Sequence, residues 1–332
     1  MADTTRILVV GYGNVGRGVI SAIARNPDME LAGVMTRRPD VVEKELADKC
    51  RVFKLSNMSA VSREGIADVA VLCGGSKQDL PKYGPKMARY ISTVDSFDTH
   101  ANIPQYFAKM DKIAHAEGNV VIISAGWDPG TFSLERVLGD SFLPDSKKYT
   151  FWGPGVSQGH SDAVRKIAGV KDARQYTLPV EGALNSVRTG ANPDLTTREK
   201  HRRLVYVVAE SSDPKELARI QQEIVSMPNY FVDYDTEVRF IGTEEMKQEH
   251  SAYPHGGFVL TAGETGSGNK AMIEYKNQWA SNPEATGSIL VACARAARRF
   301  DRMKLYGAYT MLDIPPNFYS PRSRKDLLKH FM

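Results

Sequence analysis

Short apolar runs alternate with helical patterns between residue 6 and residue 124. The runs predict strands at 6–10, 30–35, 52–55, 67–73, 90–94 and 119–124. The segments between them predict helices at 15–25, 40–49, 80–89 and 103–117. Continuous apolar runs of this length are typical of strands that helices cover on both faces. The alternation therefore predicts an α/β domain with a Rossmann-type, doubly wound parallel sheet.

After Leu138 the pattern changes to strands that are separated by polar loops. Strands are predicted at 173–179, 203–209, 236–241 and 257–262, after a glycine-rich polar loop region at 151–161. One helix should begin after Asp213, with Pro214 at its first position and Glu216 at its third. These features predict a second, α+β domain with a mainly antiparallel sheet, suited to substrate binding and dimerisation.

A long helix predicted at 283–303 should return to the first domain. The expected limits are therefore 1–126, completed by 281–332, for the dinucleotide-binding domain, and 127–280 for the substrate and dimerisation domain.

The first predicted strand runs into a loop with glycines at positions 11, 13 and 16. In a dinucleotide-binding unit these give the tight turn, the close approach of backbone to pyrophosphate and the close packing of helix on strand. The following helix would direct its N-terminal N–H groups at the pyrophosphate. We expect a dinucleotide here. The alternative is a glycine-rich turn in another kind of α/β protein.

The end of the second predicted strand points to one dinucleotide. NAD-binding units usually have an acidic residue there for the ribose 2′-hydroxyl. This chain has Thr36, Arg37 and Arg38 instead, and arginine suits the 2′-phosphate of NADP because it is planar and permanently charged. The alternative is that both arginines are ordinary surface residues.

Composition changes this interpretation little. The chain has 42% hydrophobic and 25% charged residues, with a net charge of +4, and no apolar run approaches the roughly 20 residues of a membrane span. Its basic cluster at 198–203 lacks a nucleic-acid-binding motif. The three cysteines have no metal or redox spacing, and no metal-site motif occurs. We expect a cytoplasmic protein without a metal, a nucleic-acid partner or a membrane partner.

Several polar or aromatic residues follow the strands. Two aspartates suit an ammonium group, arginine and histidine suit a carboxylate, and tryptophan suits an aliphatic chain, so together they predict an amino acid ligand. The candidates are Asp98, Asp128, Trp152, His160, His201, Arg203 and His255.

Each candidate also has a simpler interpretation. Asp98 could cap the helix that begins near Ile103, and Asp128 could form a turn before Pro129. Trp152 could belong to the core. His160 and His255 could serve only as hydrogen-bonding residues of loops and turns.

Seven motifs resemble the meso-diaminopimelate dehydrogenase family, and the likeness extends over the whole chain. They are Val10–Arg17, Thr93–His100, Ser124–Gly130, Phe151–Gly153, Ser157–Asp162, Gln175–Thr177 and Pro254–Gly257. The first is shared by many dehydrogenases, whereas Gly126–Gly130 and Ser157–Asp162 are specific to this family.

The resemblance implies NADP-dependent oxidative deamination of the D-centre of meso-2,6-diaminopimelate. The products would be L-2-amino-6-oxopimelate, ammonia and NADPH, and the reverse reaction is the reductive amination of lysine biosynthesis. It also implies a cytoplasmic homodimer. Two alternatives remain open: another NADPH-dependent amino- or oxo-acid oxidoreductase, such as a dihydrodipicolinate reductase-like enzyme or a broad D-amino acid dehydrogenase, and a non-catalytic NADPH sensor.

The resemblance also implies roles for individual residues. Asp98, Asp128 and Trp152 would hold the reacting end, and one of the two aspartates would accept the proton. The distal end would be held by Thr177, Arg203, His255 and Asn282, and Gln158 and Gly159 would line the loop over the substrate.

Contacts with NADP(H) are implied for four groups of residues. They are Gly11, Tyr12, Gly13, Asn14, Val15 and Gly16; Thr36, Arg37 and Arg38; Gly74, Gly75 and Ser76 with Ser96, Phe97 and Asp98; and Trp127, Asp128, Pro129 and Gly130. The chain has Lys77 and Gln78 where members often have Ala and Thr, which leaves the cofactor contacts of these two residues open.

Overall fold

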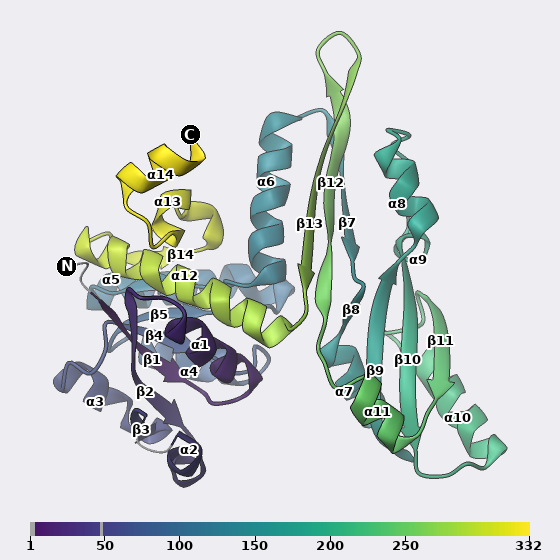
Figure 1. Cartoon of the computed structure of the whole chain (residues 1–332), viewed down its shortest axis with the longest axis horizontal. Helices are drawn as coiled ribbons and strands as arrows, with labels where there is room; N and C mark the ends of the chain where they lie inside the picture. Colours follow the sequence, from purple (N-terminus) through teal and green to yellow (C-terminus); the bar gives the residue numbers. More distant parts are fainter. Residues whose placement is uncertain (1–3, 47–48) are drawn as a thin grey trace. The chain divides into compact units, whose positions relative to one another are not determined.

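The computed structural model describes residues 4–46 and 49–332. The chain divides into two compact units, Met1–Leu134 with Pro283–Met332 (unit 1) and Glu135–Asn282 (unit 2) (Figure 1). The domain limits expected from the sequence stay a prediction. Residues 47 and 48 of the helix predicted at 40–49 lie outside the described residues.

Unit 1 contains a seven-stranded parallel sheet with the order β14-β6-β5-β4-β1-β2-β3. Its strands are β1 (Thr5–Val10), β2 (Met29–Thr36), β3 (Arg51–Lys54), β4 (Val69–Leu72), β5 (Ser92–Asp95), β6 (Val120–Ile122) and β14 (Gly307–Tyr309). The direction of winding reverses between β1 and β4. Ligands of open parallel sheets bind at such a point, beyond the carboxyl ends of the strands.

Helices cover both faces of this sheet. They are α1 (Asn14–Ala24), α2 (Pro39–Leu46), α3 (Met58–Arg63), α4 (Asp79–Met87), α5 (Ile103–Glu117) and α12 (Asn282–Arg302), with α13 (Pro316–Tyr319) and α14 (Arg324–Phe331) near the C-terminus. Successive residues of a strand point to opposite faces. Ile7 and Val9 accordingly join the core that includes α1 and α12, whereas Leu8 and Val10 join the core that includes α4 and α5.

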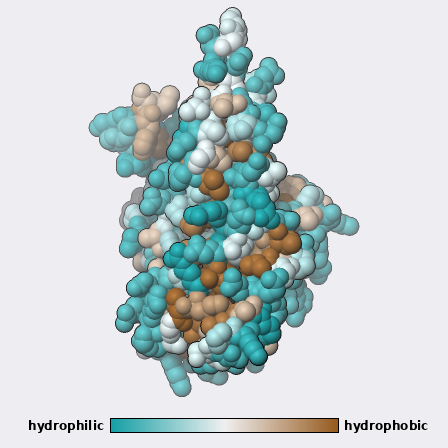
Figure 2. All heavy atoms as spheres, turned by 90° about the vertical axis from the view of Figure 1, so that its right-hand side faces the viewer, coloured by the Kyte–Doolittle hydropathy of each residue, from teal (hydrophilic) through white to brown (hydrophobic). Residues whose placement is uncertain are grey.

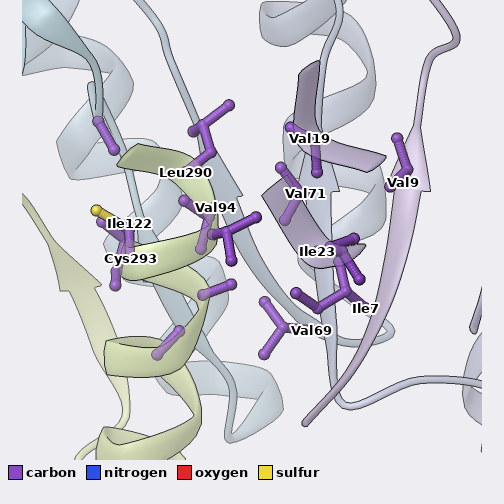
Figure 3. Close-up of a cluster of buried hydrophobic side chains, with 14 of the residues drawn as sticks. Ile7, Val9, Val19, Ile23, Val69, Val71, Val94, Ile122, Leu290 and Cys293 are labelled. Atoms are coloured by element: carbon purple, nitrogen blue, oxygen red, sulfur yellow. The ribbon is translucent and has the colours of Figure 1, made fainter. Parts of the chain in front are cut away.

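Helices α1 and α12 pack closely in the first of these cores. Figure 3 shows Val19 and Ile23 of α1 with Leu290 and Cys293 of α12 around the valines and isoleucines of the sheet. Gly18 permits this approach, because a Cβ there would lie 2.3 Å from the carbonyl oxygen of Pro283.

An ion pair also holds α12 in unit 1. The buried guanidinium of Arg295 donates to both carboxylate oxygens of Asp28, at 2.6 and 2.8 Å, and to the side chain of Asn26. Hydrogen bonding from Arg295 lowers the pKa of Asp28. The C-terminal segment is thereby linked to the turn between α1 and β2.

Unit 2 has two sheets where the sequence predicted one. The four-stranded sheet has the order β11-β10-β9-β8 and the three-stranded sheet the order β13-β12-β7; only β10 and β11 pair in parallel. Their strands are β7 (Ser146–Trp152), β8 (Gly155–Val156), β9 (Val170–Pro179), β10 (His201–Ala209), β11 (Asp235–Phe240), β12 (His255–Thr265) and β13 (Asn269–Trp279). The prediction of a mainly antiparallel α+β domain is confirmed.

Helix α6 (Phe132–Phe142) leads from unit 1 into unit 2. The other helices of unit 2 are α7 (Gln158–Val164), α8 (Glu181–Arg188), α9 (Thr197–Lys200), α10 (Pro214–Val225) and α11 (Thr243–Glu249). The sequence indicated only one clear helix in this domain, so the predicted number of helices was too small. Helix α10 begins as predicted, with the Asp213 side chain accepting from the backbone N–H of Lys215.

The predicted loop region at 151–161 was wrong. Trp152 ends β7, residues 155–156 form β8, and α7 begins at Gln158. Gly153, Pro154 and Gly155 are typical of turns, so the sequence indicated a loop where these elements lie. Strand β7 is stabilised by pairing with β12, more than a hundred residues further on, and such long-range pairing leaves no local signal.

The hydropathy of the surface agrees with the composition of the chain. The face drawn in Figure 2 is mainly hydrophilic, with hydrophobic residues in separate patches. No helix among the described residues is long and apolar enough to cross a membrane.

Candidate functional site

The loop between β1 and α1 has the geometry that its glycines predict. Gly11 has a φ of +103°, and a Cβ at Gly16 would lie 2.1 Å from the carbonyl oxygen of Gly11. A Cβ at Gly13, by contrast, would meet no heavy atom within 4 Å. Gly11 therefore makes the turn and Gly16 the close packing, while Gly13 leaves open space in which a ligand can approach the backbone.

A cleft of about 420 Å³ adjoins this loop. The ends of three adjacent strands and the loops after them line it, including Gly11–Gly13, Thr36–Arg38 and Cys73–Gly75. Lys77 and Gln78 are exposed and are not among its lining residues. The cleft thus joins the glycine loop to the two arginines that were predicted to bind a 2′-phosphate.

The two arginines differ in their partners. Arg37 forms a 3.4 Å ion pair with Asp79, whose other carboxylate oxygen accepts from the N–H of Gly75. The backbone N–H of Arg38 donates to Thr36 Oγ1 at 3.2 Å. Among the described residues Arg38 has no carboxylate partner, so its charge is available to an anion in the cleft.

Ser76 links the loops after β4 and β5. Its hydroxyl accepts from the N–H of Asp98 at 3.0 Å and donates to the carbonyl of Ser96 at 3.4 Å. The carboxylate of Asp98 is exposed, and Asn102, the N-cap of α5, makes no side-chain capping bond. The interpretation of Asp98 as the cap of this helix is therefore wrong.

The turn after β6 carries the other predicted residues of unit 1. Trp127 is buried and packs on Phe132 at 4.5 Å between ring centroids. Asp128 is half-buried and precedes a cis peptide bond to Pro129, and Gly130 has a φ of +136°. Unit 1 therefore collects the glycine loop, the Arg37–Arg38 pair, Asp98 and Asp128 at the carboxyl edge of one sheet.

The structure also identifies Asp95, which the sequence analysis did not single out. This carboxylate is fully buried at the end of β5 and accepts hydrogen bonds from two backbone N–H groups and from Tyr106. Burial raises the pKa of Asp95 to about 6. The available signal was an acidic residue directly after the strand predicted at 90–94.

In unit 2, Thr177 of β9 and Arg203 of β10 lie directly opposite each other. The buried guanidinium of Arg203 donates to Thr177 Oγ1 and lies over the ring of Tyr234 at 3.8 Å. Within residues 4–46 and 49–332 it has no carboxylate partner. Burial lowers the pKa of Arg203. A buried cation without a counterion is suited to binding the carboxylate of a ligand.

Trp152 is positioned by His201. His201 Nε2 accepts from the backbone N–H of Trp152 at 2.8 Å, and the two rings stack at 5.1 Å. Burial lowers the pKa of His201 to about 4, so the ring is neutral at pH 7 and can accept. His201 was considered as a ligand contact in the sequence, but its contacts here support Trp152.

His160 is also kept neutral. Its Nδ1 lies 2.8 Å from Ser157 Oγ, and its ring packs at nearly right angles to the rings of Tyr230 and Phe231. Burial, with a contribution from nearby Arg203, lowers the pKa of His160 to about 4. The interpretation of His160 as a hydrogen-bonding residue accounts for the contact with Ser157, but His160 lies in α7 and not in the predicted loop.

Two glycines bring the remaining residues of unit 2 together. A Cβ at Gly153 would lie 2.0 Å from the carbonyl oxygen of Thr177, and one at Gly155 would lie 2.9 Å from His255 Cα. Trp152, Thr177 and His255 are therefore gathered around the short segment 153–155. Gln158 and Gly159 begin α7, and Asn282 begins α12.

Comparisons with known proteins agree with this arrangement. Residues 126–281 match the family of diaminopimelic acid dehydrogenase C-terminal domains. A meso-diaminopimelate D-dehydrogenase of Ureibacillus thermosphaericus is 53% identical over 98% of this chain and 99% of its own length. The chain belongs to the meso-diaminopimelate D-dehydrogenase family.

Two crystal structures of relatives are also similar. One is a sixfold mutant of meso-DAPDH from Clostridium tetani with DAP, which has a TM-score of 0.91 and 45% identity over 99% of this chain and 100% of that one. The other is an engineered D-amino acid dehydrogenase bound to NADP+, with a TM-score of 0.84 and 40% sequence identity; the match covers 99% of this chain and 100% of that one.

Membership of the meso-diaminopimelate D-dehydrogenase family confirms the predicted family and the predicted fold class. Its members are oxidoreductases that act on a CH–NH₂ group. The fold and the comparisons support a nicotinamide cofactor.

Proposed function

We propose that the protein catalyses the NADP-dependent oxidative deamination of the D-centre of meso-2,6-diaminopimelate to L-2-amino-6-oxopimelate and ammonia. The observation that carries this proposal is the buried Arg203, which lacks a carboxylate partner in the described chain and contacts Thr177. It is suited to the distal carboxylate of a long diamino acid. Lysine biosynthesis is the role proposed for the reverse reaction.

The mutant relative from Clostridium tetani supports the assignment of the distal site. Its substituted residues are, in order, a Gln, a Thr, an Arg, a Pro, a His and an Asn. This chain has the same types in the same order at Gln158, Thr177, Arg203, Pro254, His255 and Asn282. We assign Thr177, Arg203, His255 and Asn282 to the distal end of the substrate, and Gln158 and Gly159 to the loop that covers it.

For the cofactor we propose NADP(H). Arg37 and Arg38 follow β2 where an NAD-binding unit would have an acid, and an engineered relative was crystallised with NADP+. The open space at Gly13 fits the pyrophosphate. When bound, the nicotinamide would accept the hydride, which this protein's own side chains cannot do.

The chain's residues would prepare the substrate for this step. Asp98 and Asp128 hold the ammonium group of the reacting end, and one of them accepts its proton, because the amine must be neutral before its carbon can release hydride. Trp152, held by His201, contacts the aliphatic chain. Orienting the C–H bond contributes much of the rate, and anchoring the distal end leaves only a D-centre correctly oriented.

The protein is further proposed to act in the cytoplasm as a homodimer, with the dimer contact formed by the substrate domain at 127–280. The family resemblance supports these assignments. Size-exclusion chromatography with light scattering would test the dimer directly.

One panel of rates tests the proposed function. The meso, L,L and D,D isomers of diaminopimelate and D-alanine are each offered with NADP+ and with NAD+. We expect NADP+ to be reduced in the presence of the meso isomer, and no cofactor reduction in any other combination.

Two other outcomes favour the alternatives. Turnover of D-alanine at a similar rate would indicate a broad D-amino acid dehydrogenase. Tight binding of NADPH without turnover of any of the four compounds would indicate a sensor.

A further inference from the structure

A single side chain joins the two loops that carry Asp98 and Asp128. Asp95 Oδ1 accepts from the N–H of Phe97 at 3.0 Å and from the N–H of Ser124 at 3.2 Å. The backbone carbonyl of Asp95 also accepts from the N–H of Ala125 at 2.8 Å. The loop after β5 and the loop after β6 are thus both hydrogen-bonded to one residue.

Tyr106 of α5 fixes the other oxygen of this carboxylate. Its hydroxyl donates to Asp95 Oδ2 at 2.8 Å, and its ring stacks on Phe97 with centroids 4.3 Å apart. Gly84 makes room for the hydroxyl, because a Cβ there would lie 2.3 Å from it. Phe97 directly precedes Asp98, so these contacts hold the backbone next to a residue of the proposed site.

Stability alone does not explain this arrangement, because the buried carboxylate lowers the free energy of unfolding. Asp95 has no exposed surface, and burying a carboxylate without a cationic partner opposes folding. An apolar residue would fill a position inside a core more cheaply. The carboxylate is the group that can accept from two loops and from Tyr106 at once, which indicates a requirement for position.

We propose that Asp95, oriented by Tyr106, is a positioning residue that holds the loops at 96–98 and 124–130 in the geometry that catalysis needs. The inference rests on the proposed function, because these loops carry Asp98 and Asp128. A displacement of about 1 Å at a reacting group can lower a rate by about a hundredfold. Asp95 itself would not contact the substrate.

Three variants and one control test the proposal. Asp95→Ala removes all three side-chain contacts, and Tyr106→Phe removes only the hydroxyl. Asp95→Asn is the conservative variant, since its oxygen can still accept from both N–H groups and its amide can donate to Tyr106. Thr93→Val is the matched control: Thr93 lies on the same strand, has no exposed surface, and its Oγ1 makes no hydrogen bond.

The expected result is a separation of kcat from cofactor binding. Asp95→Ala should lower kcat at least about tenfold, while the Kd for NADP+ changes less than about threefold. The reason is that the glycine loop after β1 and Thr36–Arg38 after β2, where the pyrophosphate and the 2′-phosphate are proposed to bind, are not hydrogen-bonded to the Asp95 side chain. Tyr106→Phe should lower kcat less, and Asp95→Asn and Thr93→Val should stay near the wild type. A kcat for Asp95→Ala equal to that of Thr93→Val would overturn the proposal, as would an Asp95→Asn variant as slow as Asp95→Ala.

Amide hydrogen exchange gives a readout that does not depend on the substrate. Residues 96–98 and 124–130 should exchange faster in Asp95→Ala than in Thr93→Val, measured on the full chain without substrate. Unchanged exchange would overturn the positioning role even in an active enzyme. If the wild type fails to oxidise meso-diaminopimelate, faster exchange would still support the role of Asp95 while the proposed function fails. If Asp95→Ala does not fold, Tyr106→Phe is subjected to both measurements with the same criteria.

Discussion

The cleft of unit 1 that we propose for the cofactor and the residues of unit 2 that we propose for the substrate are built by different means. In unit 1 the cleft is lined largely by loops just after parallel strands, with four glycines, Gly11, Gly13, Gly74 and Gly75, among the lining residues. In unit 2 Thr177 and Arg203 lie within strands that pair across a sheet. The first kind of site follows from local sequence, whereas the second depends on which strands become neighbours.

The arginines of the two regions also differ in their exposure to solvent and in their ion pairing. The side chain of Arg37 is 68% exposed and paired with Asp79, whereas Arg203 is 6% exposed without a carboxylate partner in the described chain. Water screens the first charge and not the second. Substitution of the buried arginine should therefore have the larger effect, and its effect on ligand binding should exceed its effect on stability.

Two glycine substitutions should give the largest effects and separate binding from packing in unit 1. Gly16→Ala places a Cβ 2.1 Å from a carbonyl oxygen and should cost several kcal/mol of stability together with cofactor binding. Gly13→Ala meets no protein atom within 4 Å, so it should fold normally yet weaken NADP+ by about a hundredfold or more through contact with the pyrophosphate. Thermal unfolding and NADP+ titration would measure both. Normal NADP+ affinity in Gly13→Ala would contradict the placement of the pyrophosphate.

Arg203→Met tests the buried cation of unit 2. Loss of a charge-assisted contact to the distal carboxylate should raise KM for meso-diaminopimelate by about 10- to 100-fold, or roughly 1.5–3 kcal/mol. The Kd for NADP+ should not change. Since Arg203 has no counterion in the described chain, the unfolding free energy should fall little or even rise.

Arg202→Met is the matched control for Arg203→Met. Arg202 is the exposed neighbour on β10, and its side chain points to the opposite face of the strand. Equal values of KM for the two variants would argue against a carboxylate at Arg203.

Replacing Arg37 and Arg38 together with serine should have a smaller, selective effect. The Kd for NADP+ should rise about tenfold, and that for NAD+ should change little, because only NADP+ carries the 2′-phosphate. The loss should shrink at high salt, since both side chains are exposed. Arg25→Ser, an exposed arginine at the end of α1, is the control. Equal losses for both cofactors would exclude a 2′-phosphate contact.

The last comparison concerns pH, and a buried group of unit 1 and a buried group of unit 2 should change the stability in opposite directions. Burial lowers the pKa of His201 from 6.5 to about 4. Its contribution to stability is therefore present above pH 6.5 and is lost as the pH falls through 4. Burial raises the pKa of Asp95 from 3.8 to about 6, so its destabilising contribution is complete above pH 6 and is relieved as the pH falls toward 3.8.

Urea unfolding at pH 7 and pH 5 would measure these contributions. From pH 7 to 5, neutral His201 should contribute a loss of about 2 kcal/mol and Asp95 a gain of about 1 kcal/mol. His201→Gln should therefore make the protein less sensitive to acid, and Asp95→Asn should make it more sensitive. A pH dependence identical to that of the wild type in both variants would show that neither group titrates as its burial indicates.

The sequence predicted unit 1 more accurately than unit 2 for a physical reason. Inner strands of the parallel sheet such as β1 and β4 are buried on both faces, so the runs Ile7–Val10 and Val69–Leu72 can be recognised without knowledge of their neighbours. Strand β13 alternates between exposed and half-buried residues and pairs only at one side. Its pattern resembles a polar loop until β12 lies beside it.

The same reasoning separates residues whose roles the sequence predicted from residues whose roles it missed. Roles could be predicted for Gly11–Gly16, Arg37 and Arg38 because each would act through its own backbone or charge. Asp95 and His201 act through other residues, and their partners, Ser124 and Trp152, lie 29 and 49 positions away. Nothing near Asp95 in the sequence shows that one carboxylate oxygen accepts from two loops.

The sequence by itself determined that this chain has a Rossmann-type sheet, a glycine loop for a dinucleotide and a family likeness carried by short motifs. These features depend on local hydrophobic periodicity and on residues within one turn. Only the tertiary structure decided that unit 2 has two sheets, that Trp152 ends a strand supported by His201, and that Arg203 is buried without a counterion in the described chain. Such features arise from strand pairing and burial between distant segments, which local sequence does not encode.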